Sequence, residues 1–252
     1  MSLRLPTLLR LAVLALLLAF LVDPQRFAFV FAGLARNGQP VIYNQGSLLD
    51  LTVNHLMIVL AATVAATLAA VGLAILVTRP FGAEFLALSR SLANIGQTFP
   101  PVAVLALAVP VLGFGTAPTL VALFLYGLLP IFENALTALT TLPRAVTDAA
   151  RGMGMTGPQR LVRVELPLAI PVILAGIRLS TVISISTATI GSTVAARTLG
   201  EVIIAGLLSN NTAFVAQGGL IVAVLAVLIY DGLSALERNL LARTGQGRQA
   251  EA

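Results

Sequence analysis

The charged residues Glu133 and Arg178 lie inside long apolar stretches of the sequence, where a charge needs a partner and could take part in proton or ion chemistry. Glu133 lies within the stretch Thr119–Leu139, and Arg178 lies about ten residues into a later apolar stretch. If both stretches cross a membrane, both charges lie roughly 12–15 Å from its inner surface, at 1.5 Å per residue. An unpaired charge at the centre of a spanning helix costs about 2.5–3.5 kcal/mol on insertion scales. We therefore expect Glu133 and Arg178 to pair or to share a wet cavity, as a packing pair or as part of a gate.

A segment rich in serine and threonine follows Arg178. Eight of the fourteen positions from Ser180 to Thr193 carry a hydroxyl, which is unusual for a lipid-facing helix but acceptable where helices pack or line a path. Positions three or four apart share one face of a helix. The candidates for a solute pathway on this face are Ser180, Ser184, Thr187 and Gly191. Hydrogen bonding between helices is the alternative explanation of these hydroxyls.

Asn94 and Gln97 form a third polar group, shortly before the consecutive prolines Pro100 and Pro101. Proline donates no backbone hydrogen bond and clashes with the carbonyl four residues earlier, so a helix is expected to break here. Broken backbone at membrane depth has to be buried in protein or to line a cavity. We therefore count Asn94 and Gln97 among the candidate pathway residues.

Other site chemistry is missing from the sequence. There is no cysteine, only one histidine, no P-loop and no pair of histidines with metal-ligand spacing. A serine, histidine and acid triad would have to be built around His55, which we expect at an outer membrane boundary and to which we assign no role. The sequence therefore predicts no catalytic residue, no metal site and no cofactor on this chain.

The elements that carry these residues are predicted to be membrane-spanning helices. The chain of 252 residues is 58% hydrophobic and 10% charged, whereas a typical soluble domain is about 25% charged. A helix needs about 20 mostly apolar residues to cross the bilayer. Five stretches have that length, approximately Leu56–Val77, Ile95–Phe114, Thr119–Leu139, Leu168–Ala196 and Phe214–Leu236. A shorter run, Leu11–Val22, is expected to be a retained, tilted helix, with a cleaved signal peptide as the alternative. The predicted fold is an all-α membrane protein, a polytopic bundle of about six transmembrane helices.

Arginine supplies all 15 basic residues other than the histidine, and its distribution predicts the topology. With the N-terminus inside, eleven arginines fall in cytoplasmic segments and three fall outside, which is a clear positive-inside bias. The inner ones are Arg4, Arg10, Arg79, Arg90, Arg144, Arg151, Arg160, Arg163, Arg238, Arg243 and Arg248, and the outer ones are Arg26, Arg36 and Arg197. Both termini are therefore expected in the cytoplasm. We divide the chain into residues 1–53 (first helix and outer segment), 54–240 (transmembrane domain) and 241–252 (cytoplasmic tail).

The long inner segment from Pro143 to Pro167 is predicted to form two short helices on the membrane surface. Pro143 suits a first helical position and Gly154 suits a helix end. Thr156 can cap a second helix that has Pro158 in its first turn. Pro167 is then expected to end that helix, where the next membrane run begins.

This segment resembles the signature loop of the permease subunits of binding-protein-dependent ATP-binding-cassette importers. The family pattern is E-A-A, three residues, G, nine residues, I, one residue, then L-P, and the chain departs from it only by Asp148 for glutamate and Val164 for isoleucine. The resemblance implies a coupling helix that sits in a cleft of a cytoplasmic ATP-binding subunit. The coupling residues that it implies are Asp148, Ala149, Ala150, Gly154, Val164, Leu166 and Pro167.

Segments that begin at Asn94, Ala122 and Leu166 resemble the quaternary-amine branch of this family, which imports glycine betaine, choline, carnitine and related osmoprotectants. The resemblance implies a permease of the bacterial inner membrane that moves such a solute from periplasm to cytoplasm by alternating access. It also implies partners: ATP-binding subunits that carry ATP and Mg²⁺, a periplasmic substrate-binding protein and a second permease subunit, identical or similar. Nucleic acid is not an expected partner.

Three other readings remain open from the sequence. One is a stand-alone secondary transporter driven by an ion gradient, in which Glu133 and Arg178 would couple ion to solute. The second is an ATP-driven permease for a different small solute. The third is a membrane scaffold without transport activity. Dependence of transport on ATP and on a partner ATPase separates them.

Overall fold

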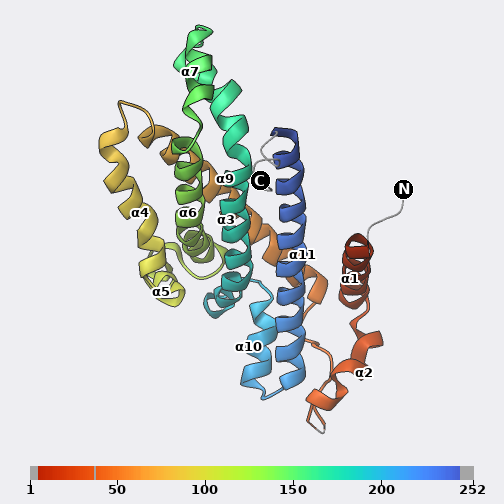
Figure 1. Ribbon diagram of the computed structural model, residues 1–252. Coiled ribbons are helices and arrows are strands. Elements are labelled where there is room, and N and C mark those ends of the chain that lie inside the picture. The colour runs from red at the N-terminus through yellow and green to blue at the C-terminus, as the bar shows by residue number, and fades with distance from the viewer. Residues whose placement is uncertain (1–4, 37, 245–252) are drawn as a thin grey trace. The chain divides into compact units, whose positions relative to one another are not determined.

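The computed structural model describes residues 5–36 and 38–244, which form helices joined by turns with no strand among them (Figure 1). The longer helices are α1 (Leu5–Val22), α3 (Leu48–Val77), α4 (Leu86–Thr98), α5 (Pro101–Leu112), α6 (Thr116–Thr140), α9 (Leu166–Thr187) and α11 (Thr212–Thr244). The shorter ones are α2 (Ala28–Phe31), α7 (Arg144–Gly152), α8 (Gly157–Arg160) and α10 (Gly200–Leu208). Arg4, Arg248 and residues 245–252 of the predicted tail lie outside the described residues, as does the side chain of Arg243.

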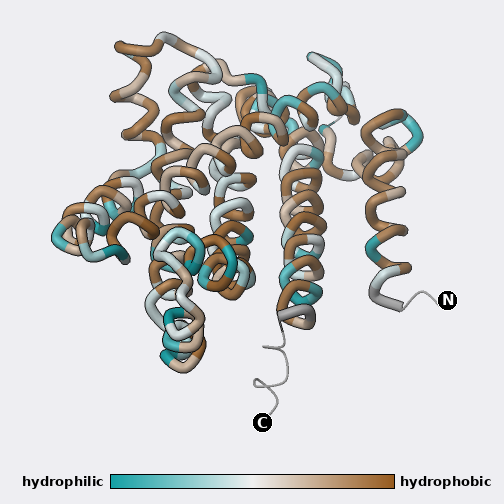
Figure 2. The backbone as a smooth tube through the Cα atoms, turned by 90° about the horizontal axis from the view of Figure 1, so that it is seen from above, coloured by the Kyte–Doolittle hydropathy of each residue, from teal (hydrophilic) through white to brown (hydrophobic). Residues whose placement is uncertain are grey.

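The described helices confirm the predicted all-α membrane fold. Four are long and apolar enough to cross a bilayer: Leu48–Val77, Thr116–Thr140, Gly157–Val194 and Thr212–Ala242. Two further spans qualify as bent pairs, Thr7–Val22 with Pro24–Leu34 (bent by 114°) and Ala83–Thr98 with Pro101–Leu112 (bent by 98°). Hydrophobic residues prevail along most of these helices (Figure 2). When each bent pair is counted as one span, the six spans correspond to the six stretches expected from hydropathy.

The break expected at Pro100 and Pro101 is present, and it changes the extent of one predicted span. The predicted stretch was Ile95–Phe114, but α4 begins earlier, at Leu86, and ends at Thr98, and α5 runs from Pro101 to Leu112. Phe99 between them is extended, with φ −93° and ψ 137°, as is usual for a residue before proline. Since the two prolines have no N–H, the carbonyls of Gly96 and Gln97 cannot receive the usual helical hydrogen bond.

The chain forms two compact units, and the four long single helices contribute to both. Unit 1 consists of the described parts of Met1–Ala61, with Pro101–Leu123 and Ser184–Ile229. Within unit 1, side chains near the start of α11 hold the irregular segment before α3. Gln217 donates to the carbonyl of Val41 (2.7 Å) and accepts from the amide of Tyr43 (3.1 Å), and Asn211 donates to the carbonyl of Pro40 (2.8 Å).

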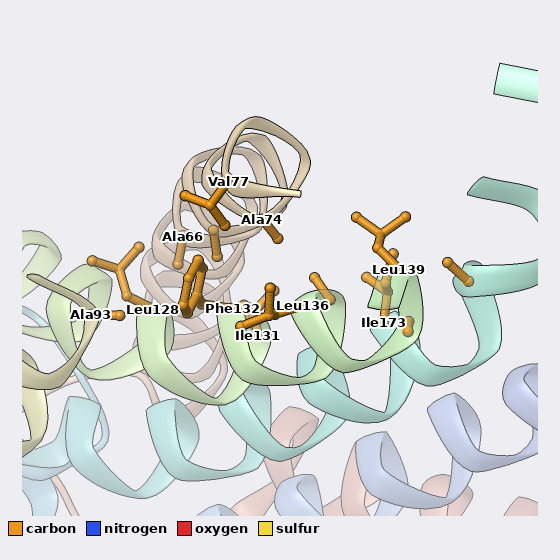
Figure 3. Packing of buried hydrophobic residues seen from close by; sticks show 14 residues of the cluster. Ala66, Ala74, Val77, Ala93, Leu128, Ile131, Phe132, Leu136, Leu139 and Ile173 are labelled. Carbon is orange, nitrogen blue, oxygen red and sulfur yellow. The ribbon is translucent and has the colours of Figure 1, made fainter. Parts of the chain in front are cut away.

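Unit 2 consists of Ala62–Pro100, Phe124–Ile183 and the described part of Tyr230–Ala252. Its core is built on a stripe of alanines, Ala66, Ala70 and Ala74, spaced by four along α3 and fully buried. Small residues let helices approach closely, so packing and not a polar contact holds this core together. Figure 3 shows the alanine stripe facing the large side chains of α6, among them Ile131 and Phe132. Residues of α4 and α9 complete the cluster: Ala93, Ala169 and Ile173.

Candidate functional site

The predicted coupling segment begins with α7, which presents a polar face outward. Figure 1 shows α7 beyond the ends of α6 and α9 that flank it. Asp148 and Ala149 are exposed, while Ala150 is buried at 1% exposure. Arg151 Nη1 lies 3.5 Å from Asp148 Oδ1, and both side chains are more than 60% exposed. An exposed pair of this kind contributes at most about 1 kcal/mol. Because the two side chains are exposed and only weakly held together, both are accessible to another protein. Pro143 is the N-cap residue directly before α7, whereas the sequence predicted it at the first helical position.

The turn between α7 and α8 has the geometry that its residue types predict. Gly154 has φ +75°, a left-handed conformation that glycine adopts without the steric cost that a side chain imposes. Thr156 caps α8 with a capping box: its hydroxyl accepts from the amide of Gln159, and the Gln159 side chain accepts from the amide of Thr156. Pro158 lies in the first turn. The predicted pair of short helices therefore exists, with Met153 70% exposed at its tip.

Pro167 does not end the second helix, which corrects the prediction. α8 continues through a π-helical turn, Leu161–Glu165, directly into α9, so that helical backbone runs without a gap through Leu166 and Pro167. A proline inside an α-helix clashes with the carbonyl four residues earlier. The wider π turn immediately before Pro167 relieves this clash, because its hydrogen bonds skip one additional residue, as in the bond from the amide of Leu166 to the carbonyl of Leu161.

Glu165 lies at the end of the π turn, and sequence reasoning did not select it. Its carboxylate accepts from Arg79 Nη2 at 2.5 Å and from Arg160 Nε at 2.7 Å. The side chain is only 7% exposed, and those of Arg79 and Arg160 are 17% and 18% exposed. The only sequence signal was a carboxylate directly before an apolar span. The two arginines also line a groove of about 610 Å³ beside the segment, together with Arg151 and Phe81.

The expected pairing of Glu133 with Arg178 is wrong. Glu133 accepts two hydrogen bonds from Arg90 of α4, at 2.7 Å and 3.1 Å. The helix sequence alone did not reveal this partner because 43 residues separate the two. Both side chains are partly exposed, 48% for Arg90 and 36% for Glu133.

Arg178 pairs instead with α11. Its Nη1 donates to Glu237 Oε2 at 2.5 Å and to Ser234 Oγ at 2.8 Å, and its guanidinium lies 4.8 Å from the ring centroid of Tyr230. The physical premise, that a charge in a spanning helix must be paired, therefore holds. The predicted partner was wrong because Glu237 of α11 lies within reach of Arg178. Hydropathy placed Glu237 just beyond the end of the predicted span Phe214–Leu236, so it was not considered as a partner.

Asn94 and Gln97 are exposed on α4, beside the α4–α5 break. Gln97 donates to the carbonyl of Tyr126 on α6 (2.9 Å), and the Tyr126 hydroxyl donates to the carbonyl of Phe99. α4 and α6 are held together at this level, because Gly96 touches the backbone of Leu125. The break therefore lies at a helix–helix contact and not at a free end.

The first two residues of the hydroxyl-rich face, Ser180 and Ser184 of α9, are buried. Ser180 is 0% and Ser184 is 1% exposed, and neither hydroxyl oxygen has a hydrogen-bond partner among the described residues. Thr187 is partly exposed, and Gly191, in the 3₁₀ segment Ala188–Val194, is buried against Thr119. A buried hydroxyl without a partner costs about 1–3 kcal/mol. Their role as pathway lining stays a prediction.

His55 is a fully buried structural residue and not an interfacial one. It is 0% exposed, its Nε2 lies 3.0 Å from the carbonyl oxygen of Ile185, and its Nδ1 accepts from the amide of Leu199 at 3.4 Å. These contacts fix the neutral ring with the proton on Nε2. Within residues 5–36 and 38–244, no group of three or more acidic or histidine side chains is arranged to hold a metal ion.

Comparison with known proteins identifies relatives of this chain. Residues 70–241 match the family described as binding-protein-dependent transport system inner membrane component. The osmoprotectant import permease protein OsmY of Salmonella typhimurium is 39% identical over 200 residues, which cover 79% of this chain and 85% of that protein. The glycine betaine/carnitine/choline permease protein OpuCB of Bacillus subtilis is 38% identical over 204 residues (81% and 93%). The choline permease protein OpuBB of the same organism is 39% identical over 198 residues (78% and 90%).

Solved structures share the fold. An inward-facing form of the MetNI methionine ABC transporter aligns with a TM-score of 0.69 at 20% identity and covers 77% of this chain and 95% of that chain. An amino acid ABC transporter solved with histidines aligns with a TM-score of 0.63 at 18% identity and covers 75% and 92%. At 20% and 18% sequence identity, what these proteins share with this chain is the arrangement of the helices.

Proposed function

The chain belongs to the family of binding-protein-dependent transport system inner membrane components, and we propose that it carries a trimethylammonium osmoprotectant such as glycine betaine, choline or carnitine into the cytoplasm. It is a multi-pass membrane protein and a permease subunit of an ATP-binding-cassette importer. One observation carries the substrate proposal. Relatives aligned over 85% to 93% of their own length are named as permeases for osmoprotectants, glycine betaine, carnitine or choline.

We further propose that the energy for transport comes from hydrolysis of ATP, which is bound with Mg²⁺ by partner subunits. These partner subunits bind the segment from α7 to Pro167. The exposed residues of this segment support this, since Asp148 and Ala149 of α7 and Met153, which directly follows α7, are all accessible. An accessible methionine adapts its shape to a partner surface. In this proposal the segment lies on the cytoplasmic side with both chain termini, and a periplasmic binding protein delivers the solute to the opposite face.

A second permease subunit, identical or similar, completes the pathway in our proposal. The Arg90–Glu133 pair supports this assembly, because it lies in spanning helices yet is 48% and 36% exposed in the single chain. Charges that face lipid are costly, so this face is expected to turn toward water or toward protein. Asn94 and Gln97 lie exposed on the same helix, α4, as Arg90. We assign these four residues to the pathway wall or to the contact with the second permease.

The experiment is uptake by vesicles that contain the chain with its co-purifying ATPase and its binding protein. Labelled choline and glycine betaine are supplied outside, and ATP inside. Uptake that requires both ATP and the binding protein supports the proposal. Uptake by the chain alone, driven by an ion gradient without ATP, would point to a secondary transporter. ATP-dependent uptake of a different solute only would refute the substrate class and leave the permease role intact.

A further inference from the structure

The buried carboxylate of Glu165 joins two parts of the chain that lie far apart in sequence. Arg160 belongs to α8 of the coupling segment, and Arg79 lies two residues after the end of α3, 86 residues before Glu165. We propose that Glu165 is a positioning residue that fastens the coupling segment to the end of α3, so that a push on the segment moves α3 as well as α9. This inference rests on the proposed function, because it concerns how the force of a partner ATPase enters the bundle.

The geometry is that of a clamp with two different attachment points. One carboxylate oxygen, Oε2, accepts from Arg79, and the other, Oε1, accepts from Arg160. All three side chains are less than a fifth exposed. Hydrogen bonds between ionised groups are about twice as strong as neutral ones. Water competes weakly at this exposure, so the three side chains hold one arrangement.

The π turn is what allows Arg160 and Glu165 to meet. They are five residues apart, and in an α-helix with 3.6 residues per turn such positions point about 140° away from each other. In a π-helical turn, the backbone bond itself joins residues five apart, so both side chains lie on the same side. The turn from Leu161 to Glu165 has this geometry. The same turn accommodates Pro167, so one backbone feature both continues the helix and closes the clamp.

The other end of the clamp is attached to the packed core of unit 2. Arg79 lies two residues after Val77, which is 4% exposed and belongs to the same buried cluster as Ala74. Arg79 also donates from Nε to the carbonyl of Ile75 at 3.4 Å, within the last turn of α3. A displacement of α8 therefore reaches the alanine stripe of α3 through two ionic hydrogen bonds and not through flexible loop.

Glu165→Gln tests the clamp with the smallest change of shape. In glutamine an NH2 donor replaces one carboxylate oxygen, so in the same position it faces the N–H of Arg79 or of Arg160 instead of accepting from it, and the two guanidiniums are left without a counter-charge. In the complete importer with its ATPase and binding protein, we expect ATP hydrolysis to continue while choline moved per ATP falls about tenfold, inside the range of about 5- to 150-fold typical of coupling between two sites. Glu165→Asp should recover part of the ratio. A purely structural role would lower both rates together and leave the ratio unchanged.

Arg160→Gln provides a second test if Glu165→Gln prevents assembly of the importer. It removes one attachment and leaves the Arg79–Glu165 pair electrically balanced, so the protein should fold, with a lower ratio of choline to ATP. The matched control is Arg26→Gln, which removes an arginine–carboxylate pair with Asp23 whose side chains are 82% and 44% exposed, and which should leave the ratio unchanged. A wild-type ratio in an assembled Glu165→Gln or Arg160→Gln importer overturns the inference. Absence of ATP-dependent uptake in the wild-type importer instead refutes the proposed function.

Discussion

Replacing Gly96 by alanine adds one methyl group at the closest approach of α4 to α6. The new carbon would lie 2.0 Å from the carbonyl oxygen of Leu125 and 2.4 Å from its carbonyl carbon. Both are backbone atoms, so no rotamer change relieves the clash, and the helices must separate by about 1 Å to bring the contact to 3.0 Å. Overpacking of this kind costs up to about 3 kcal/mol. Alanine regains about 1 kcal/mol through its higher helix propensity, so the net destabilisation is about 2 kcal/mol.

The assay is thermal unfolding of the purified protein in detergent. At about 2–4 °C per kcal/mol for a chain of 150–250 residues, the Gly96→Ala variant should melt about 4–8 °C lower than wild type. Gly72→Ala is the matched control, because Gly72 lies inside α3 and an added methyl meets nothing within 4 Å. The control should melt at the wild-type temperature or slightly higher. Equal melting temperatures for the two variants would refute the close contact between α4 and α6.

Three further predictions follow from single contacts. Arg178→Gln and Glu237→Gln should each lower the melting temperature, and the double variant should lower it by less than the sum of the two single effects, because each single change leaves one unpaired charge and the double change leaves none. Simple additivity of the two single effects in this double-mutant cycle would contradict the pairing. His55→Phe should destabilise the protein by about 1–3 kcal/mol, because it removes two buried hydrogen bonds, to the carbonyl of Ile185 and from the amide of Leu199, and an unchanged melting temperature would contradict these two hydrogen bonds. Gly154→Val should reduce choline uptake per ATP in the reconstituted importer, because a β-branched residue is strained at φ +75°; a wild-type ratio would show that the left-handed turn is dispensable for coupling.

Local features of the coupling segment were predictable because they depend on neighbours in sequence. Thr156 and Gln159 are three residues apart, the spacing of a capping box, and Gly154 is a residue type that ends helices. The break before Pro101 follows from the missing N–H of two prolines. In each case the deciding atoms lie within one helical turn, so residue type and spacing contain the whole interaction. The continuation of the helix through Pro167 was missed because it needed a π turn, which has no pattern in residue types.

The partners of the charged residues were not predictable in the same way. Glu133 was assigned to Arg178, yet it meets Arg90, and Arg178 meets Glu237 from 59 residues away. Hydropathy gives the depth of a charge in the membrane, which made both residues candidates for pairing. It does not give the rotation of each helix about its axis, and that rotation decides which side chains face each other.

Apolar length and local spacing were therefore enough to predict that the chain crosses a membrane several times and that residues 143–167 contain two short helices. Tertiary structure decided which carboxylate meets which guanidinium, that Glu165 holds Arg79 and Arg160, and that His55 is buried. These contacts need helices packed at fixed rotations. Close packing of small residues such as the alanines of α3 sets those rotations, and it joins residues that have no relation in sequence.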